Sequence, residues 1–217
     1  MKSVLLIGMG RFGHHLCKNL VDLGNEVMII DNDEKSVEDL APIVTSVLIG
    51  DCTNPEILKS IGVRNYDICF VCIGSNFQSS LEITSLLKDL GAKYVVSKAS
   101  RDIHAKFLLR NGADEVIYPD KDIAEKTAKR FSANNVFDYI ELTHDYPVYE
   151  IPPLAKWAGK TILDSNIRRK HNISILGVKH PDGRVTMLPT ADYMIDANDH
   201  LMILGSSENI EKLLKLL

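Results

Sequence analysis

The sequence lacks several features that would assign it to a common functional class. Its 25 Lys and Arg residues are outnumbered by 29 Asp and Glu residues, so no basic excess indicates binding to nucleic acid. No apolar run approaches the roughly 20 residues that span a bilayer. Apolar residues nevertheless make up 45% of the 217 residues, which is enough to bury a core. The composition therefore predicts a globular protein.

Signatures of several enzyme classes are also missing. The sequence has no G-x-S-x-G elbow and no G-x-x-x-x-G-K-[ST] loop, which argues against a hydrolase of the α/β type and a P-loop kinase. Its seven histidines form no H-x-x-x-H or H-E-x-x-H spacing. We therefore predict no catalytic residues.

The cysteines do not indicate a disulfide scaffold, because Cys17, Cys52, Cys69 and Cys72 all lie in the first third of the chain. Cys69 and Cys72 form a C-x-x-C motif inside an apolar, strand-like run. Residues three apart on a strand point to opposite faces, so this motif cannot easily form a redox or zinc site. We expect four buried thiols.

Short apolar runs alternate with helical patterns through the first half of the chain. The runs cover residues 3–8, 26–31, 45–50, 67–74, 94–99 and 115–118. This alternation is typical of a doubly wound α/β fold with a parallel sheet of the Rossmann type, and we predict that it forms a domain of residues 1–135.

The pattern changes after Asn135. Asp182 and Gly183 form a hairpin signal, residues 199–205 read as a strand, and residues 209–217 read as a closing helix. We predict a small α+β module of residues 136–217.

The stretch "GMGRFG" follows the first strand and opens a helix, which is typical of a phosphate-binding loop. Gly8 permits the tight turn, Gly10 lets the backbone approach a pyrophosphate, and Gly13 lets the helix pack closely on the strand. Asp31, at the end of the second strand, can accept both hydroxyls of a ribose. That carboxylate would repel a 2'-phosphate, which disfavours NADP.

Further contacts are expected where the next strands end. Asp51, Cys52 and Thr53 follow the third strand and would lie at the adenine end of the site. Gly74 and Ser75 follow the fourth strand, near the phosphates or the second sugar, because ligands of such folds lie at the carboxyl ends of the strands.

These motifs, with "VSKASRDIHAKFLLRNGADEVIYPDKDIAEKTA" and "WAGKTILDSNIRRKHNISILGVK", resemble the RCK (regulator of potassium conductance) domains of Ktr and Trk potassium uptake systems. The resemblance runs almost end to end. It implies a cytoplasmic, non-enzymatic regulatory subunit that binds ATP/ADP or NAD/NADH. It also implies homodimers assembled into an octameric ring, docked peripherally on the inner face of the cell membrane against a K+-translocating subunit.

The resemblance also assigns residues. Met9, Arg11 and Phe12 match the family's phosphate loop, and Lys98 matches a further ligand contact; an exposed lysine at a strand end is the alternative for Lys98. The arginine at position 11 approaches the terminal phosphate of ATP in the Ktr branch. Such a charge-assisted contact is worth about 1.5–3 kcal/mol, enough to separate ATP from ADP or NAD by a factor of ten.

Other assignments by resemblance keep an alternative. Asp120 matches a glutamate that helps to hold a divalent or monovalent cation near the nucleotide, but it could instead cap the following helix. In the C-terminal module, some relatives bind cyclic di-AMP at the dimer interface. The matching positions here are Ile162, Leu163, Arg168 and Pro189, and a purely structural role in dimerisation is equally consistent with them.

Two other functions are compatible with a nucleotide-binding fold. One is an NAD-dependent oxidoreductase with an unrecognised substrate, and the other is a redox-sensing transcription regulator. The sequence contains neither a helix-turn-helix pattern nor a basic patch, which argues against the transcription regulator. The sequence leaves open which nucleotide pair is used, which membrane partner is bound, and whether the ligand opens or closes it.

Overall fold

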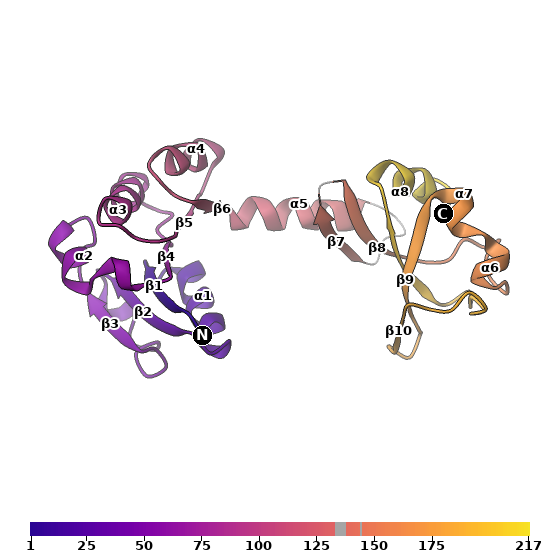
Figure 1. Cartoon of the computed structure of the whole chain (residues 1–217), viewed down its shortest axis with the longest axis horizontal. Coiled ribbons are helices and arrows are strands. Elements are labelled where there is room, and N and C mark those ends of the chain that lie inside the picture. The colour runs from indigo at the N-terminus through magenta and orange to yellow at the C-terminus, as the bar shows by residue number, and fades with distance from the viewer. Residues whose placement is uncertain (133–137, 144) are drawn as a thin grey trace. The chain divides into compact units, whose positions relative to one another are not determined.

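The computed structural model describes residues 1–132, 138–143 and 145–217, which form two compact units. Unit 1 comprises residues 1–122 and unit 2 comprises residues 123–217 (Figure 1). The boundary predicted between residues 135 and 136 lies outside the described residues.

Unit 1 contains a six-stranded, wholly parallel sheet in the order β3-β2-β1-β4-β5-β6. The strands are β1 (Ser3–Ile7), β2 (Glu26–Asp31), β3 (Ser46–Ile49), β4 (Ile68–Val71), β5 (Val95–Lys98) and β6 (Glu115–Ile117). All six lie within the predicted apolar runs. The order reverses between β1 and β4, which is where a doubly wound fold binds its ligand. The prediction of this fold is confirmed.

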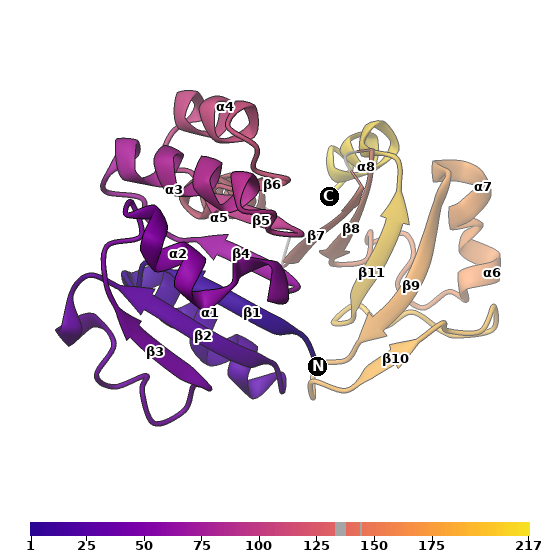
Figure 2. The ribbon, with the colours of Figure 1, turned by 60° about the vertical axis from the view of Figure 1, so that its left-hand side comes forward.

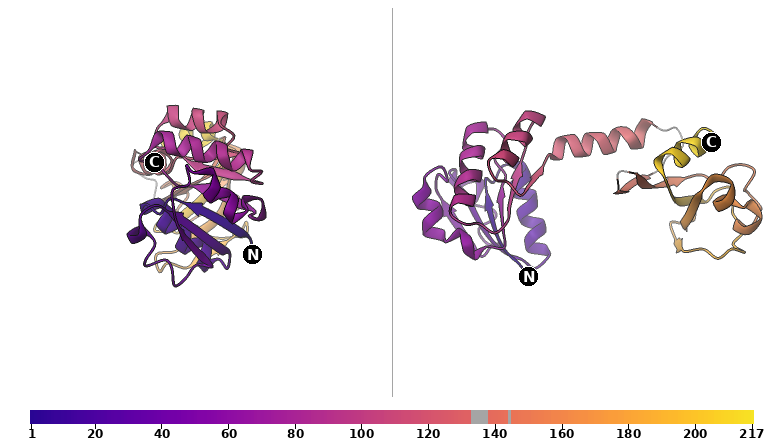
Figure 3. Two further views of the ribbon diagram at one scale, coloured as in Figure 1. Left: turned by 90° about the vertical axis from the view of Figure 1, so that its left-hand side faces the viewer. Right: turned by 45° about the horizontal axis from the view of Figure 1, so that its top comes forward.

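Helices cover both faces of this sheet (Figure 3). They are α1 (Arg11–Asp22), α2 (Pro55–Ile61), α3 (Phe77–Asp89) and α4 (Asp102–Arg110), with short 3-10 turns at Glu34–Ser36 and Val63–Asn65. Cys17 of α1 packs with Leu6 and Ile29 in the core on one face. Leu58 of α2 and Leu87 of α3 belong to the core on the other face.

The helix ends follow from local chemistry. Asn54 caps α2, because its side-chain oxygen accepts a hydrogen bond from the Glu56 N–H at 3.1 Å, and Pro55 is the first helical residue. Asn76 caps α3 in the same way, by accepting from the Ser79 N–H at 3.1 Å. Each of these helices therefore begins after a short loop that follows a strand, at the carboxyl edge of the sheet.

The last helix of this part of the chain, α5 (Pro119–Ser132), begins in unit 1 and continues in unit 2. The structure describes this helix up to Ser132, and residues 133–137 lie outside the described residues. Ile123 and Phe131 on α5 are exposed.

Unit 2 contains a five-stranded antiparallel sheet in the order β10-β9-β11-β8-β7 (Figure 2). The strands are β7 (Asp138–Thr143), β8 (Tyr146–Ile151), β9 (Ile173–Lys179), β10 (Val185–Met187) and β11 (His200–Gly205). The predicted hairpin at Asp182 and Gly183 joins β9 to β10, and the predicted strand near the end is β11. The sequence pattern does not predict strands β7 and β8.

The helices of unit 2 are short: α6 (Ile162–Ser165), α7 (Ile167–His171) and α8 (Ser207–Leu214). Trp157, Ile203 and Leu213 are buried together in a core that joins the sheet to these helices. Helix α8 begins two residues before the predicted position, because Ser206 caps it by accepting from the Asn209 N–H. Across the parts of the chain that the structure describes, no helix is both long and apolar enough to cross a membrane.

Candidate functional site

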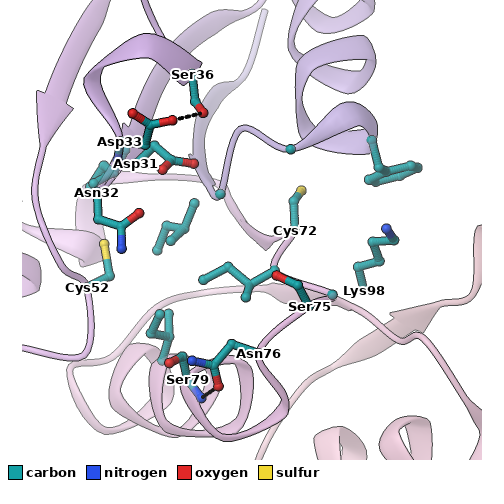
Figure 4. Close-up of a pocket in the computed structure, with 18 of the residues that line it drawn as sticks. Asp31, Asn32, Asp33, Ser36, Cys52, Cys72, Ser75, Asn76, Ser79 and Lys98 are labelled. Carbon is teal, nitrogen blue, oxygen red and sulfur yellow. Dashed lines mark hydrogen bonds between the residues drawn. The ribbon is translucent and has the colours of Figure 1, made fainter.

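A cavity of about 690 Å³ opens at the carboxyl edge of the parallel sheet in unit 1 (Figure 4). This volume lies within the range of small-molecule sites. Most of the predicted ligand residues line it: Gly8, Gly10, Arg11, Phe12, Asp31, Asp51, Cys52, Gly74, Ser75, Lys98 and Asp120. Met9, Gly13 and Thr53 are not among the lining residues.

The three glycines of the loop are needed for different reasons. Gly8 has a φ of +93°, and a Cβ there would lie 2.8 Å from the Ile73 side chain. A Cβ at Gly13 would overlap the carbonyl oxygen of Gly8, so only glycine lets α1 pack this closely on the loop. Gly10 has an ordinary φ of −63° and nothing within 4 Å of its potential Cβ. The protein's own packing therefore does not require glycine at position 10.

The N-terminus of α1 is free of a side-chain cap, because Gly10 occupies the cap position and no acidic residue lies in the first turn. Arg11 and Phe12, the first helical residues, line the cavity. The N–H groups and the positive end of the helix dipole thus favour an anion at the cavity end next to the loop.

Asp31 is held rigidly by backbone hydrogen bonds on both of its oxygens. Oδ2 accepts from the Met9 N–H at 2.5 Å, and Oδ1 accepts from the Asp33 N–H at 2.9 Å. The side chain of Met9 is buried. The hydrogen bond from its backbone N–H links the phosphate loop to the Asp31 carboxylate. Each carboxylate oxygen keeps a further lone pair that could accept from a ribose hydroxyl.

Asp51 is held by its neighbour Thr53 in the same manner. The backbone N–H of Thr53 donates to Oδ1 of Asp51 at 2.9 Å and the Thr53 hydroxyl donates to it at 2.8 Å. These two hydrogen bonds lower the pKa of Asp51 and keep its carboxylate charged. Thr53 does not line the cavity, but it holds the Asp51 carboxylate that does.

Charge is unevenly distributed around the cavity. Asp31 and Asp33 lie on one side of it and Lys98 on the other (Figure 4). Lys98 Nζ lies 5.5 Å from the centre of the Phe12 ring, a cation–π distance. Arg11 is exposed and has no ion-pair partner among residues 1–132, 138–143 and 145–217. A ligand with polar hydroxyls at one end and phosphates at the other matches this polarity.

Two of the four cysteines, Cys52 and Cys72, line the cavity. Burial raises the pKa of each thiol to about 12, so both stay protonated and unreactive at neutral pH. Cys69 packs in the core on one face of the sheet and Cys72 in the core on the other. The prediction of buried thiols is confirmed, since all four are free and buried.

Asp120 lies in the first turn of α5, whose first residue is Pro119. It is therefore inside the helix rather than at its cap position, and it reaches the cavity wall. Within the described ranges, no group of three or more His, Cys, Asp or Glu side chains could hold a metal ion. A cation at Asp120 would need the phosphates of the ligand as additional partners.

Sequence reasoning missed several lining residues. Asn32, Asp33 and Ser36 follow β2, and Ser36 Oγ donates to Asp33 Oδ2 at 3.0 Å (Figure 4). Asn76 and Ser79 come from the first turn of α3, and Ser100 follows β5. The strand ends and the Asn76 cap could have indicated these residues, because every strand of the sheet ends at the same edge.

The four residues expected to bind cyclic di-AMP all belong to unit 2. Ile162 and Leu163 start α6, and their N–H groups donate to the carbonyl oxygens of Tyr193 and Ala191. Leu163 and Arg168 are exposed, and Pro189 is half-buried after β10. A cavity of about 370 Å³ in this unit is lined by other, apolar residues: Pro152, Pro153, Leu154, Ala155, Ala158, Ala197, Leu216 and Leu217.

The fold and the cavity define a class of protein, a Rossmann-type unit with a glycine loop followed by a small α+β unit. The family model of the TrkA-N domain matches residues 4–119, and that of the TrkA-C domain matches residues 148–217. The chain is 39% identical to Ktr system potassium uptake protein C of Bacillus subtilis and 36% identical to protein A of the same system, each over 211 residues. Each comparison covers 97% of this chain and 95% of the relative. The chain belongs to this TrkA-N and TrkA-C family of potassium uptake proteins, which confirms the resemblance.

Solved structures agree on the fold. A GsuK channel matches with a TM-score of 0.69 and 19% identity, over 99% of this chain and 39% of the channel. A GsuK channel bound to NAD matches with a TM-score of 0.65 and 17% identity, over the same shares of the two chains.

Proposed function

We propose that this protein is the nucleotide-binding regulatory subunit of a potassium uptake system. The observation that carries the proposal is Gly10, which lines the cavity although nothing in the protein lies near its potential Cβ. A bound pyrophosphate explains why that space is kept open. The uncapped N-terminus of α1 supplies the N–H groups for the phosphates, and Asp31 supplies the acceptor for the ribose hydroxyls.

The nucleotide is ATP in one state and ADP in the other. Arg11 is exposed at the phosphate end and has no ion-pair partner in the part of the chain that the structure describes, so its guanidinium can bind a third phosphate. Lys98 and Asp120 line the cavity and act as further contacts, Asp120 through a cation bridged to the phosphates. NAD and NADH are the alternative pair, and the NAD-bound GsuK channel is the reason to include them in the test.

The ligand's identity is tested by calorimetric titration of ATP, ADP, NAD, NADH and cyclic di-AMP into the wild type and Arg11→Ala. We expect the ratio of ATP to ADP affinity to fall by about tenfold in Arg11→Ala. An unchanged ratio would show that Arg11 does not distinguish the two nucleotides. Lys2→Ala is the matched control, because Lys2 is an exposed cation that precedes β1, at the opposite edge of the sheet from the loop.

The names of the relatives support a membrane partner that translocates K+. We place the protein on the cytoplasmic face of the membrane, as a homodimer assembled into an octameric ring. Nucleotide exchange changes the ring and thereby the K+ flux, which requires that one nucleotide favours one ring state. If a nucleotide binds one ring state more tightly than the other by about 1 kcal/mol at each of eight sites, the summed difference exceeds the ~5.5 kcal/mol that switches a two-state gate.

Light scattering and flux assays test this assembly. A strictly monomeric protein, with and without nucleotide, would contradict the ring. K+ flux through reconstituted partner should differ between ATP and ADP and should not differ in Arg11→Ala. An oxidoreductase would instead change the absorbance of NADH in the presence of a small metabolite, whereas a regulator leaves it constant.

Unit 2 has a proposed ligand site of its own. We assign Ile162, Leu163, Arg168 and Pro189 to a cyclic di-AMP site that two copies of the unit form together. Binding of cyclic di-AMP that is lost in Arg168→Ala supports the assignment. Dimerisation that survives without any such binding would leave these residues with the structural role only.

A further inference from the structure

His104 on α4 is a buried side chain that the proposed function does not use. It is fully buried, and both of its ring nitrogens have partners. Nε2 lies 2.8 Å from Ser80 Oγ on α3. Nδ1 lies 3.3 Å from the backbone N and from Oγ of Ser100, which precedes α4. One imidazole therefore joins two helices and the loop between β5 and α4.

These hydrogen bonds define the protonation state of His104. The backbone N–H of Ser100 can only donate, so Nδ1 must accept. The ring proton then lies on Nε2 and is donated to the hydroxyl oxygen of Ser80. The arrangement requires a neutral imidazole in a single tautomer.

The partners of His104 form the wall of the nucleotide cavity. Ser100 lines the cavity directly, and Ser79, next to Ser80, lines it beside the helix cap Asn76. Thr84 strengthens this wall from within, because its hydroxyl donates to the Ser80 carbonyl oxygen at 2.7 Å. His104 thus holds the start of α3 and the loop after β5 at a fixed separation.

We infer that His104 is a positioning residue of the nucleotide cavity: the neutral imidazole holds Ser100 against the start of α3, and its protonation releases this wall and weakens nucleotide binding. The inference rests on the proposed nucleotide site. The physical reason is that an imidazolium presents an N–H at Nδ1 toward the Ser100 N–H. Two donors cannot pair, so the backbone N–H of Ser100 loses its acceptor, and the loop must shift even if the Ser100 hydroxyl turns to accept from Nδ1.

Burial and a nearby positive charge both keep His104 neutral at neutral pH. Arg101 lies 5.2 Å from the centre of the Phe77 ring, and this ring packs on His104 with 4.8 Å between centroids. Burial lowers the pKa of His104 below its ordinary value of 6.5, and the positive charge of Arg101 lowers it further. Binding should therefore be constant above about pH 6.5 and weaken as the pH falls below it.

The other ionisable groups on the surrounding elements have partners or are exposed. On α4, Asp102 pairs with Lys121 at 3.0 Å, while Lys106 and Arg110 are exposed. On α3, Glu82 accepts from Gln78 at 2.7 Å. Two further groups flank the loop: Lys98 of β5 lies over Phe12, and the hydroxyl of Tyr118 donates to the Ser100 carbonyl oxygen at 2.8 Å.

The test compares nucleotide affinity between pH 5.5 and 8 in the wild type, His104→Gln and His104→Ala, with ATP and with NAD as probes. Glutamine can accept at one atom and donate at another without titrating. We expect His104→Gln to retain the wild-type affinity within about threefold at pH 8 and to lose the acid dependence. His104→Ala should bind about tenfold more weakly than the wild type at pH 8 and should show no acid dependence of its own.

Controls separate positioning from folding and from the proposed function. His15→Gln removes an exposed histidine of α1 and should keep the wild-type pH profile. Ser80→Ala keeps His104 but removes its acceptor, and should weaken binding even if the His104 variants do not fold. Identical pH profiles in the wild type and His104→Gln, or unchanged affinity in both His104→Ala and Ser80→Ala, would overturn the inference. Failure of the wild type to bind either probe at pH 8 would overturn the proposed function instead.

Discussion

The two units of this chain bury similar kinds of apolar cores but differ in the surface that each presents to a ligand. Unit 1 has a cavity lined by glycines, carboxylates and cations, with the bare end of α1 at one side. The cavity described in unit 2 is smaller and lined by proline, alanine and leucine side chains. A polar cavity with separated charges can orient a nucleotide, whereas an apolar one has few groups that fix an orientation.

The glycines of the two units differ in whether packing, a turn or a ligand requires them. In unit 1, Gly13 is required by the packing of α1, while Gly10 is required only if a ligand is present. In unit 2, Gly183 has a φ of +85° and open space around it, so it serves the hairpin turn alone. Substitutions in the two units should therefore separate stability from binding.

The largest expected effect is on the core of unit 2. Trp157 is 2% exposed and packs with Ile167 and Leu213. Trp157→Ala should lower the free energy of unfolding of unit 2 by about 3–5 kcal/mol. Nucleotide affinity should stay within about twofold of the wild type, because Trp157 belongs to the other unit. Scanning calorimetry and titration calorimetry on the same preparation measure the two quantities.

The exposed Met187 of unit 2 provides the control, and Met187→Ala should change stability by less than about 0.5 kcal/mol. If Trp157→Ala also abolished nucleotide binding, the two units could not be treated as separate in function.

Next in size is a substitution in the phosphate loop. Gly13→Ala places a Cβ against the backbone of Gly8, so α1 must move away from the sheet. We expect a loss of about 3 kcal/mol in the stability of unit 1, together with a loss of detectable nucleotide binding. Gly183→Ala in unit 2 is the matched substitution, and at its positive φ it should cost only about 1 kcal/mol. Equal costs at the two positions would contradict the packing role of Gly13.

The smallest expected effect is a pH dependence of the stability of unit 2. Burial lowers the pKa of His171, and the charges of Lys156 and Lys170 lower it further. Its Nε2 is buried without a hydrogen-bond partner among the described residues. The unfolded chain thus takes up the proton more readily than the folded one. The stability that neutral His171 contributes is complete above about pH 6.5 and is lost as the pH falls through the lowered pKa.

Thermal unfolding of the wild type and His171→Gln between pH 5 and 8 measures this contribution as the difference between the two curves. His171→Gln should leave the pH dependence of nucleotide affinity unchanged, in contrast to His104→Gln in unit 1. A difference curve that is flat with pH would show that His171 does not contribute in this way.

The sequence predicts unit 1 far better than unit 2, for physical reasons. Parallel strands are buried on both faces, so they appear as continuous apolar runs such as β1 and β4. In unit 2, Pro147 lies inside β8, where proline normally argues against a strand. Helices α6 and α7 have only four and five residues, too few to show a helical period. Asn166 and Asn172 end them in left-handed conformations.

Some residues of the candidate site can be predicted from the sequence and others cannot. The loop glycines and Asp31 follow from spacing, because a strand, a turn and a helix start place them together. Ser79 and Ser100 are far apart in sequence from the loop, and they reach the cavity only because the strands share one carboxyl edge. His104 belongs to no motif, and its role depends on contacts that the sequence alone does not specify.

The most direct test of this account is titration calorimetry of ATP and NAD into the wild type and Gly10→Ala, with thermal unfolding measured on the same samples. We expect an unchanged melting temperature in Gly10→Ala, because no protein atom beyond the two chain neighbours of residue 10 lies within 4 Å of the new Cβ. We also expect at least a tenfold loss of affinity for the nucleotide that binds, because the Cβ occupies the space of the pyrophosphate. Equal affinities in the two proteins, with both folded, would contradict the central claim that this loop binds a nucleotide.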